Sequence, residues 1–195
     1  MRVLLIGPPA SGKGTQGRRI AARFDVTYLA SGELLRAEVK AGTELGRRVA
    51  DDLAHGDLAP DDLLLDVLRE PLAAALTSGG YVLDGFPRTV AQARALDEMA
   101  AQMGGAPEIA AWFDVEPAEL LRRTRGRAAA EGRTDDADEV ARHRIDVYNA
   151  VTAPLIDYYR AAGLLIRVDA ARPVDEVTAD VLAALEPRRP GFASA

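Results

Sequence analysis

The chain has 195 residues, 48% of them hydrophobic, which is enough to bury one full core, and it carries a formal net charge of −6 with a pI near 5.0. This acidity argues against broad binding to nucleic acid or to an anionic membrane surface. Without cysteine and with only two histidines, His55 and His143, the chain cannot form disulfides or a Cys/His zinc site. No apolar run approaches the ~20 residues of a membrane span, and no uncovered apolar stripe stands out, so we expect a cytoplasmic monomer.

The first predicted element is a buried strand at 3–6, followed by the glycine-rich loop Gly7-Pro-Pro-Ala-Ser-Gly-Lys-Gly-Thr15 and the start of a helix. Backbone N–H groups in such a loop, together with the positive end of the helix dipole, favour an anion, and Lys13 adds a point charge. The spacing fits G-x-x-x-x-G-K, although Gly14 follows the lysine and the hydroxyl arrives only at Thr15. The segment predicts a site for nucleotide phosphates, with a plain Gly/Pro turn as the simpler alternative.

Strand-length apolar runs recur at 27–29, 81–83, 109–115 and 164–168, separated by segments with helical periodicity. This alternation predicts an α/β protein with an open parallel five-stranded sheet, helices on both faces, and ligands outside the carboxyl ends of the strands. The polar, mostly helical segment 31–59 is longer than a crossover needs, and we expect it to be a flap. Residues 1–187 are predicted to form one core, and 188–195 a tail.

The strand at 81–83 runs into Asp84 and then Gly85-Phe-Pro-Arg-Thr89. A carboxylate at this strand tip would face the phosphate loop, where a magnesium ion and its waters would sit. The simpler alternative makes Asp84 a turn residue and Arg88 a surface charge.

Arginines are concentrated between 122 and 144, where seven occur in a chain that is acidic overall. Planar guanidinium groups pair with phosphate oxygens through two bonds, which suits a site that must hold two polyanions together. Lysine is rare, since Lys13 and Lys40 stand against 22 arginines. The use of lysine in the phosphate loop therefore favours a need for a compact ammonium group.

These segments together resemble the adenylate kinases, in order and spacing, over nearly the whole chain. The resemblance rests on residues 7–16, Ala30-Ser-Gly-Glu-Leu-Leu-Arg36, Asp84-Gly-Phe-Pro-Arg-Thr89 with Gln92, Gly126-Arg127, Gly132-Arg-Thr-Asp-Asp136, Arg142-His-Arg144 and Thr152-Ala-Pro-Leu-Ile-Asp-Tyr-Tyr159. It implies the fold of P-loop nucleoside triphosphate hydrolases with a short lid at 126–136, and reversible transfer of phosphate from Mg-ATP to AMP. It implies Mg²⁺, held by Asp84 through water, and no zinc.

The resemblance also implies roles for individual residues. ATP would be held by Ala10, Ser11, Gly12, Lys13, Gly14, Thr15, Arg123, Arg127 and Arg172. AMP would be held by Ser31, Arg36, Asp57, Leu58, Ala59, Gly85, Phe86, Pro87, Arg88, Gln92, Arg133 and Arg144. The expected catalytic residues are Lys13, Asp84, Arg88, Arg133 and Arg144. No general base is required, because a nucleoside monophosphate has a second pKa near ~6 and is already anionic at neutral pH.

Several alternatives remain open from the sequence. Gln92 favours adenine, but a UMP/CMP kinase shares the loop, sheet and arginines, and Thr89 with Gln92 also fits a helix capping box. Arg123 and Arg127 are spaced i,i+4 and could simply solvate a helix face, and His143 is expected to be a surface residue. A non-catalytic nucleotide-binding switch is the alternative from another class, although a second set of anion-binding residues disfavours it.

Overall fold

Five parallel strands form one open sheet in the computed structural model, which describes residues 1–131 and 138–188, apart from the side chains of 127–131, 138 and 188. The strand order is β2-β3-β1-β4-β5. The strands are β1 (Arg2–Ile6), β2 (Thr27–Ala30), β3 (Tyr81–Asp84), β4 (Ile109–Asp114) and β5 (Leu165–Asp169). Each begins and ends within one residue of the predicted run, and the predicted fold class is confirmed.

Helices connect the strands, as the alternating pattern predicts. They are α1 (Lys13–Phe24), α2 (Ser31–Ala41), α3 (Glu44–His55), α4 (Asp61–Thr77), α5 (Val90–Gln102), α6 (Pro117–Glu131), α7 (Asp138–Val147), α8 (Pro154–Ala161) and α9 (Val174–Leu185), with a π-helical turn at Tyr148–Thr152 and a 3₁₀ turn at Glu186–Arg188. The residues at the ends of several helices explain where these helices stop or begin. Gly42 takes the left-handed conformation after α2, and the Thr43 hydroxyl accepts from the N–H of Gly46 at 3.0 Å to cap α3.

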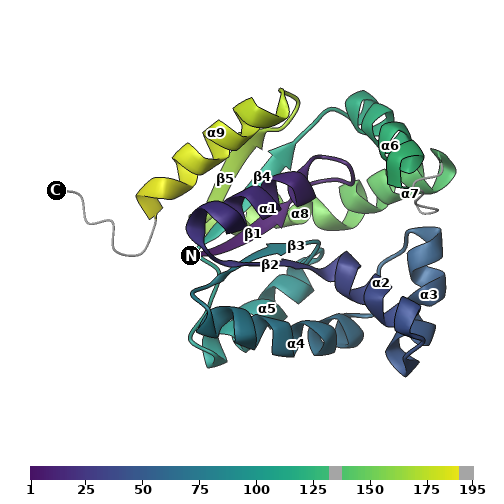
Figure 1. The fold of residues 1–195 in the computed structure, drawn as a ribbon, viewed down its shortest axis with the longest axis horizontal. Coiled ribbons are helices and arrows are strands. Elements are labelled where there is room, and N and C mark those ends of the chain that lie inside the picture. Colours follow the sequence, from purple (N-terminus) through teal and green to yellow (C-terminus); the bar gives the residue numbers. More distant parts are fainter. Residues whose placement is uncertain (132–137, 189–195) are drawn as a thin grey trace.

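The sheet is covered on both faces, and its alternating side chains enter two apolar layers. Leu4 and Ile6 of β1 pack with α4, α5 and α8, whereas Val3 and Leu5 pack with α1 and α9. Figure 1 shows α1 and α9 on one side of the strands and α4 and α5 on the other. The side chains of residues 3–6 in β1 are each at most 3% exposed, which explains why this part of the strand is a continuous apolar run in the sequence.

The register of the sheet brings the two predicted phosphate-handling segments together. Leu5 of β1 pairs with Asp84 of β3, so the loop that follows β1 and the loop that follows β3 leave the same edge of the sheet side by side. Helices α2 and α3 stand beside that edge (Figure 1). Among the described residues, no helix combines the length and apolar character needed to span a bilayer.

Candidate active site

A cleft of about 1220 Å³ opens at the carboxyl ends of β1 and β3. Its lining comes from the phosphate loop (7–15), α2, the loop after β3 (84–88), α6, α7 and the loop 171–174. Eight of the described lining residues are cationic and three are acidic, although the whole chain has a net charge of −6. The excess of positive charge in this cleft favours anionic ligands. The cationic lining residues are Lys13, Arg18, Arg36, Arg88, Arg122, Arg123, Arg144 and Arg172.

The phosphate loop wraps around the lysine that was predicted to bind phosphate. Lys13 Nζ donates to the carbonyl oxygens of Gly7 at 2.8 Å and Pro8 at 2.7 Å, and to Ser11 Oγ at 3.3 Å. Ala10 has a φ of 62° and Gly12 a φ of 92°. The left-handed conformation of Ala10 costs about 1–2 kcal/mol relative to a relaxed residue, which fits a loop held in shape for a ligand.

Tyr28 supports the carboxylate at the tip of β3. Its hydroxyl donates to Asp84 Oδ2 at 2.9 Å, and the guanidinium of Arg18 lies 4.7 Å from its ring centroid. Burial and the negative charge of Asp84 raise the pKa of Tyr28, so the phenol stays protonated and remains a donor. A Cβ at Gly17 would lie 2.5 Å from the ring, so glycine at this position makes room for Tyr28. Tyr28 was not among the predicted site residues, because a short apolar run does not show which of its side chains reaches the next strand.

Asp84 is also the predicted partner of magnesium. Its carboxylate and the hydroxyl of Thr15 both line the cleft, and oxygen atoms of this kind, supplemented by water, are the ligands that Mg²⁺ prefers. These residues therefore fit a magnesium ion held largely through water. Within residues 1–131 and 138–188, no group of three or more histidine, cysteine, aspartate or glutamate side chains is arranged to hold a metal.

Arg88 lies opposite the phosphate loop, on the segment that follows β3. Its Nε donates to the carbonyl oxygen of Gly85 at 2.8 Å. Burial lowers the pKa of Arg88, Asp84 counteracts this effect, and Arg36 lowers the pKa further. Two guanidinium groups that repel each other in a partly buried position are the expected arrangement around a bound phosphate group.

Ser31 begins α2 beside this pair of arginines. It is 1% exposed, and its hydroxyl has no hydrogen-bond partner among the described residues. A Cβ at Gly85 would lie 2.7 Å from Ser31 Oγ, so glycine at 85 allows the two segments to approach. A buried hydroxyl without a partner is rare in folded proteins, and here it lies next to a cationic cleft.

Gln92 is bound within the protein in a way that the sequence analysis gave as an alternative. Its own N–H donates to Thr89 Oγ1 at 3.0 Å, as in a capping box, but its Oε1 accepts at 2.7 Å from the N–H of Arg88, one residue before the N-cap Thr89. Its Nε2 also donates to Asp61 Oδ1 at 2.6 Å, and the side chain is 1% exposed. The predicted contact between Gln92 and adenine stays a prediction.

The segment 56–59 lies against α7. A Cβ at Gly56 would come within 2.6 Å of Arg144 Cγ, and His143 Nε2 lies 2.7 Å from Asp57 Oδ1. His143 is a surface residue, as expected, with 48% of its side chain exposed. The contact nevertheless connects the predicted flap to α7, a pairing that sequence spacing could not reveal.

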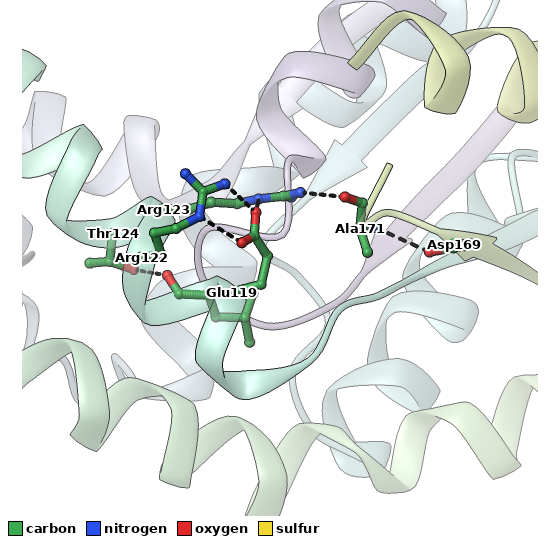
Figure 2. Close-up of polar contacts among 7 residues, drawn as sticks. Glu119, Arg122, Arg123, Thr124, Asp169 and Ala171 are labelled. Carbon is green, nitrogen blue, oxygen red and sulfur yellow. Dashed lines mark hydrogen bonds and ion pairs between the residues drawn. The ribbon is translucent and has the colours of Figure 1, made fainter. Parts of the chain in front are cut away.

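Helix α6 forms another wall of the cleft, through Glu119, Arg122 and Arg123, and Figure 2 shows the polar contacts of these residues. Glu119 accepts from Arg122 Nε at 2.7 Å, from Arg122 Nη2 at 2.6 Å and from Arg123 Nε at 2.7 Å. Hydrogen bonds from the two arginines lower the pKa of Glu119 to about 2. Arg123 also donates from Nη2 to the carbonyl oxygen of Ala171 at 3.3 Å. Glu119 and Arg122 were not predicted as site residues, although their i,i+3 and i,i+4 spacing was visible in the sequence.

The side chain of Arg172 is held by carboxylates of its own neighbourhood. It forms ion pairs with Asp169 at 3.8 Å, with Glu176 at 3.7 Å and with Asp180. Its predicted contact with ATP was expected to rest mainly on the backbone, and a side chain held in this way is compatible with that expectation.

The structure thus brings most of the predicted site residues into the lining of one cleft, whereas a few others do not contribute to this lining. The described predicted residues that line the cleft are Ala10, Ser11, Gly12, Lys13, Gly14, Thr15, Arg36, Leu58, Asp84, Gly85, Pro87, Arg88, Arg123, Arg144 and Arg172. The described predicted residues outside this lining are Ser31, Asp57, Ala59, Phe86 and Gln92. Arg133 and the side chain of Arg127 lie outside the described part of the chain.

Comparison with known proteins gives one consistent family. A family profile described as adenylate kinase matches residues 5–164. A protein of Stenotrophomonas maltophilia (strain K279a) named adenylate kinase is 42% identical over 186 residues, which cover 95% of this chain and 100% of the relative. An adenylate kinase of Xanthomonas euvesicatoria pv. vesicatoria (strain 85-10) is 46% identical over 95% of this chain and 99% of the relative. One of Thermobifida fusca (strain YX) is 42% identical over 96% of this chain and 100% of the relative. The chain belongs to the adenylate kinase family.

Proposed function

We propose that this protein catalyses the reversible transfer of the terminal phosphoryl group of Mg-ATP to AMP, giving two molecules of ADP. The observation that supports the proposal is that two groups of cationic residues line one cleft, and we assign one group to each nucleotide. The donor half consists of the phosphate loop, α6 and the loop 171–174, and the acceptor half consists of α2, the segment 56–59 and the loop 85–88. A non-catalytic protein that changes its state when it binds one nucleotide would need only one of these two halves.

In the donor half, the backbone N–H groups of the loop 10–15 and the ammonium of Lys13 would hold the ATP phosphates. Arg123, Arg127 and Arg172 would hold the rest of ATP. Lys13 already contacts loop oxygens, so it is held in place before a ligand arrives. Such prior organisation favours catalysis, because the charge need not be reoriented as the reaction proceeds.

In the acceptor half, Arg88 and Arg36 would bind the AMP phosphate, and the unpartnered hydroxyl of Ser31 would donate to it. Segment 57–59 and Gln92 would contact the base. The AMP phosphate has a second pKa near ~6 and is therefore already a nucleophile at neutral pH. The protein then has to align the two phosphates and stabilise the charge that develops between them, for which we assign Lys13, Arg88, Arg144 and, beyond the described residues, Arg133.

Magnesium would be held through water by Asp84, with the Thr15 hydroxyl beside it. When bound, it neutralises negative charge on the ATP phosphates and so makes their reaction with another anion easier. The role of Tyr28 is to keep the Asp84 carboxylate in one orientation. No residue is assigned to zinc.

Exclusion of water would be the task of the segments that border the cleft. We assign residues 31–59 to a flap over AMP and 126–136 to a short lid over ATP, both attached to a core of 1–187; residues 132–136 of this lid lie outside the described part of the chain. We also propose that the protein works as a cytoplasmic monomer on free nucleotides, since its charge of −6 disfavours nucleic acid and anionic membranes as partners.

The test is an assay of ADP formation from ATP with AMP, UMP, CMP or GMP as acceptor, run side by side. We expect AMP to be preferred, and ADP alone with Mg²⁺ to yield ATP and AMP. A preference for UMP or CMP would overturn the base assignment and support the pyrimidine kinase alternative. Absence of disproportionation from ADP would instead refute the phosphotransfer itself.

A further inference from the structure

Glu119 is a carboxylate in a cleft that otherwise attracts anions. The described lining contains three acidic residues, Glu33, Asp84 and Glu119, and each one is engaged. Glu33 pairs with Arg18 at 2.6 Å and Asp84 accepts from Tyr28, but only Glu119 lies on the α6 wall with two arginines on its oxygens. An acidic group here would repel a polyphosphate unless neighbouring cationic side chains compensated its negative charge.

The two arginines on Glu119 are exposed to different degrees. Arg122 donates two bonds to the carboxylate and is 74% exposed, whereas Arg123 donates one bond and is only 24% exposed. Glu119 itself is 23% exposed. Arg122 therefore binds both carboxylate oxygens from the solvent-exposed side, and the less exposed Arg123 is the group that Glu119 holds at the cleft wall.

Arg123 has a second hydrogen-bond partner outside α6, in the loop that contains Ala171. Its Nη2 donates to the carbonyl oxygen of Ala171, whose own N–H donates to Asp169 Oδ1 at 3.2 Å. The guanidinium thus bridges α6 and the loop between β5 and α9, as Figure 2 shows. A long side chain fixed at both ends of its guanidinium loses less conformational entropy when a ligand packs on it.

We infer that Glu119 is a positioning residue for the nucleoside part of ATP, which it serves by holding the Arg123 guanidinium across the donor half of the cleft. This inference rests on the proposed function, in which Arg123 binds ATP. Because its pKa is about 2, Glu119 remains ionised throughout the neutral range and the arrangement does not depend on pH there. Arg122 offsets its negative charge, so the triad of Glu119, Arg122 and Arg123 carries a net charge of +1.

Two simpler explanations predict different results. If Glu119 only forms a solvent-exposed ion pair on a helix, its removal should change little, because such pairs contribute weakly. If it acts only through its charge, removing a negative group beside an anion should strengthen ATP binding. The positioning role predicts the opposite sign, namely weaker ATP binding, and it predicts that the effect passes through Arg123.

The experiment compares Glu119→Gln with Glu116→Gln in the phosphotransfer assay. Glu116 is an exposed carboxylate three residues earlier that does not line the cleft, so it controls for the change in charge. We expect Glu119→Gln to raise KM for ATP about fivefold, with KM for AMP and kcat within twofold of the parent and an unchanged melting temperature. The control variant should match the parent in all four.

A double-mutant cycle with Arg123→Ala supplies the decisive readout. If Glu119 acts through Arg123, then Glu119→Gln should have no further effect on KM for ATP once Arg123 is alanine. Additive effects, an unchanged KM for ATP in the single variant, or a lower one would each overturn the inference. Calorimetric binding of ATP to the same four proteins keeps the test separate from the proposed function, because it needs no turnover. If the unaltered protein binds ATP but transfers no phosphate, the proposed function is refuted. The inference about Glu119 is then decided by the double-mutant cycle of ATP affinities alone.

Discussion

The donor and acceptor halves of the cleft differ in how far the protein satisfies their polar groups by itself. In the donor half, Lys13 Nζ has oxygen partners at 2.8 and 2.7 Å, and Glu119 binds both Arg122 and Arg123. In the acceptor half, burial and, to a smaller extent, Arg36 lower the pKa of Arg88 against the effect of Asp84, and the buried Ser31 hydroxyl has no partner among the described residues.

The difference has a thermodynamic consequence. Groups with internal partners stabilise the unliganded fold, so changing them lowers stability as well as ligand binding. Groups that lack a partner, or whose charge is disfavoured by burial and by a like-charged neighbour, gain more from a bound anion than from the rest of the protein, so changing them should lower activity with little loss of stability. Each variant below therefore requires both a kinetic and a melting measurement.

Arg88→Met should have the largest kinetic effect. By analogy with arginines that stabilise phosphoryl transfer, we expect kcat/KM for AMP to fall by about 10³- to 10⁵-fold. Relief of the buried charge should offset the loss of the bond from Arg88 to the carbonyl oxygen of Gly85, so the free energy of unfolding should change by less than about 1 kcal/mol. Arg94→Met, at an exposed position on α5, is the matched control and should retain full activity. A severe loss of stability in Arg88→Met would contradict the described difference between the halves.

Lys13→Met should lower turnover by about 10²- to 10³-fold, the range seen when one preorganised donor to a reacting anion is removed. Unlike Arg88→Met, it should also destabilise the unliganded protein by about 1–2 kcal/mol, because the loop oxygens of Gly7 and Pro8 lose their shared donor. The measurements are ADP formation and thermal unfolding.

The second lysine of the chain provides the control for this variant. Lys40 is exposed in the last turn of α2, so Lys40→Met changes the charge equally and should be kinetically silent. If Lys13→Met turned over at the parental rate while folded, the assignment of the phosphate loop would fail.

The fold could be read from the sequence because its signals are local. A continuous apolar run marks each buried strand, and residue types that favour helix ends lie at the observed ends, with Gly42 after α2, Thr43 before α3 and Pro173 before α9. The phosphate loop is local as well. Within this loop the structure adds that Ala10 adopts a left-handed backbone conformation.

The rest of the site could not be predicted, because it depends on segments that meet only in three dimensions. Tyr28 reaches Asp84 across the β2–β3 pair, and Asp57 meets His143 of a helix that lies 86 positions away. Gln92 shows the other limit, since one sequence pattern served both as a helix cap and as a predicted base contact. The internal hydrogen bonds of Gln92 show its part in capping α5, whereas its contact with the base stays a prediction.

Ser31→Ala should have the smallest effect and is the most direct test of the difference between the halves. The hydroxyl is buried and unpartnered among the described residues, so its removal should leave the melting temperature unchanged or raise it slightly. Loss of one hydrogen bond to the AMP phosphate should raise KM for AMP about tenfold, equivalent to ~1.4 kcal/mol, with KM for ATP unchanged. Ser78→Ala is the control, because that hydroxyl donates to the carbonyl oxygen of Ala74 at 3.1 Å at the exposed end of α4. A lower melting temperature for Ser31→Ala with an unaltered KM for AMP would mean that Ser31 stabilises the fold. The polar groups of the acceptor half would then have partners within the protein, as those of the donor half do.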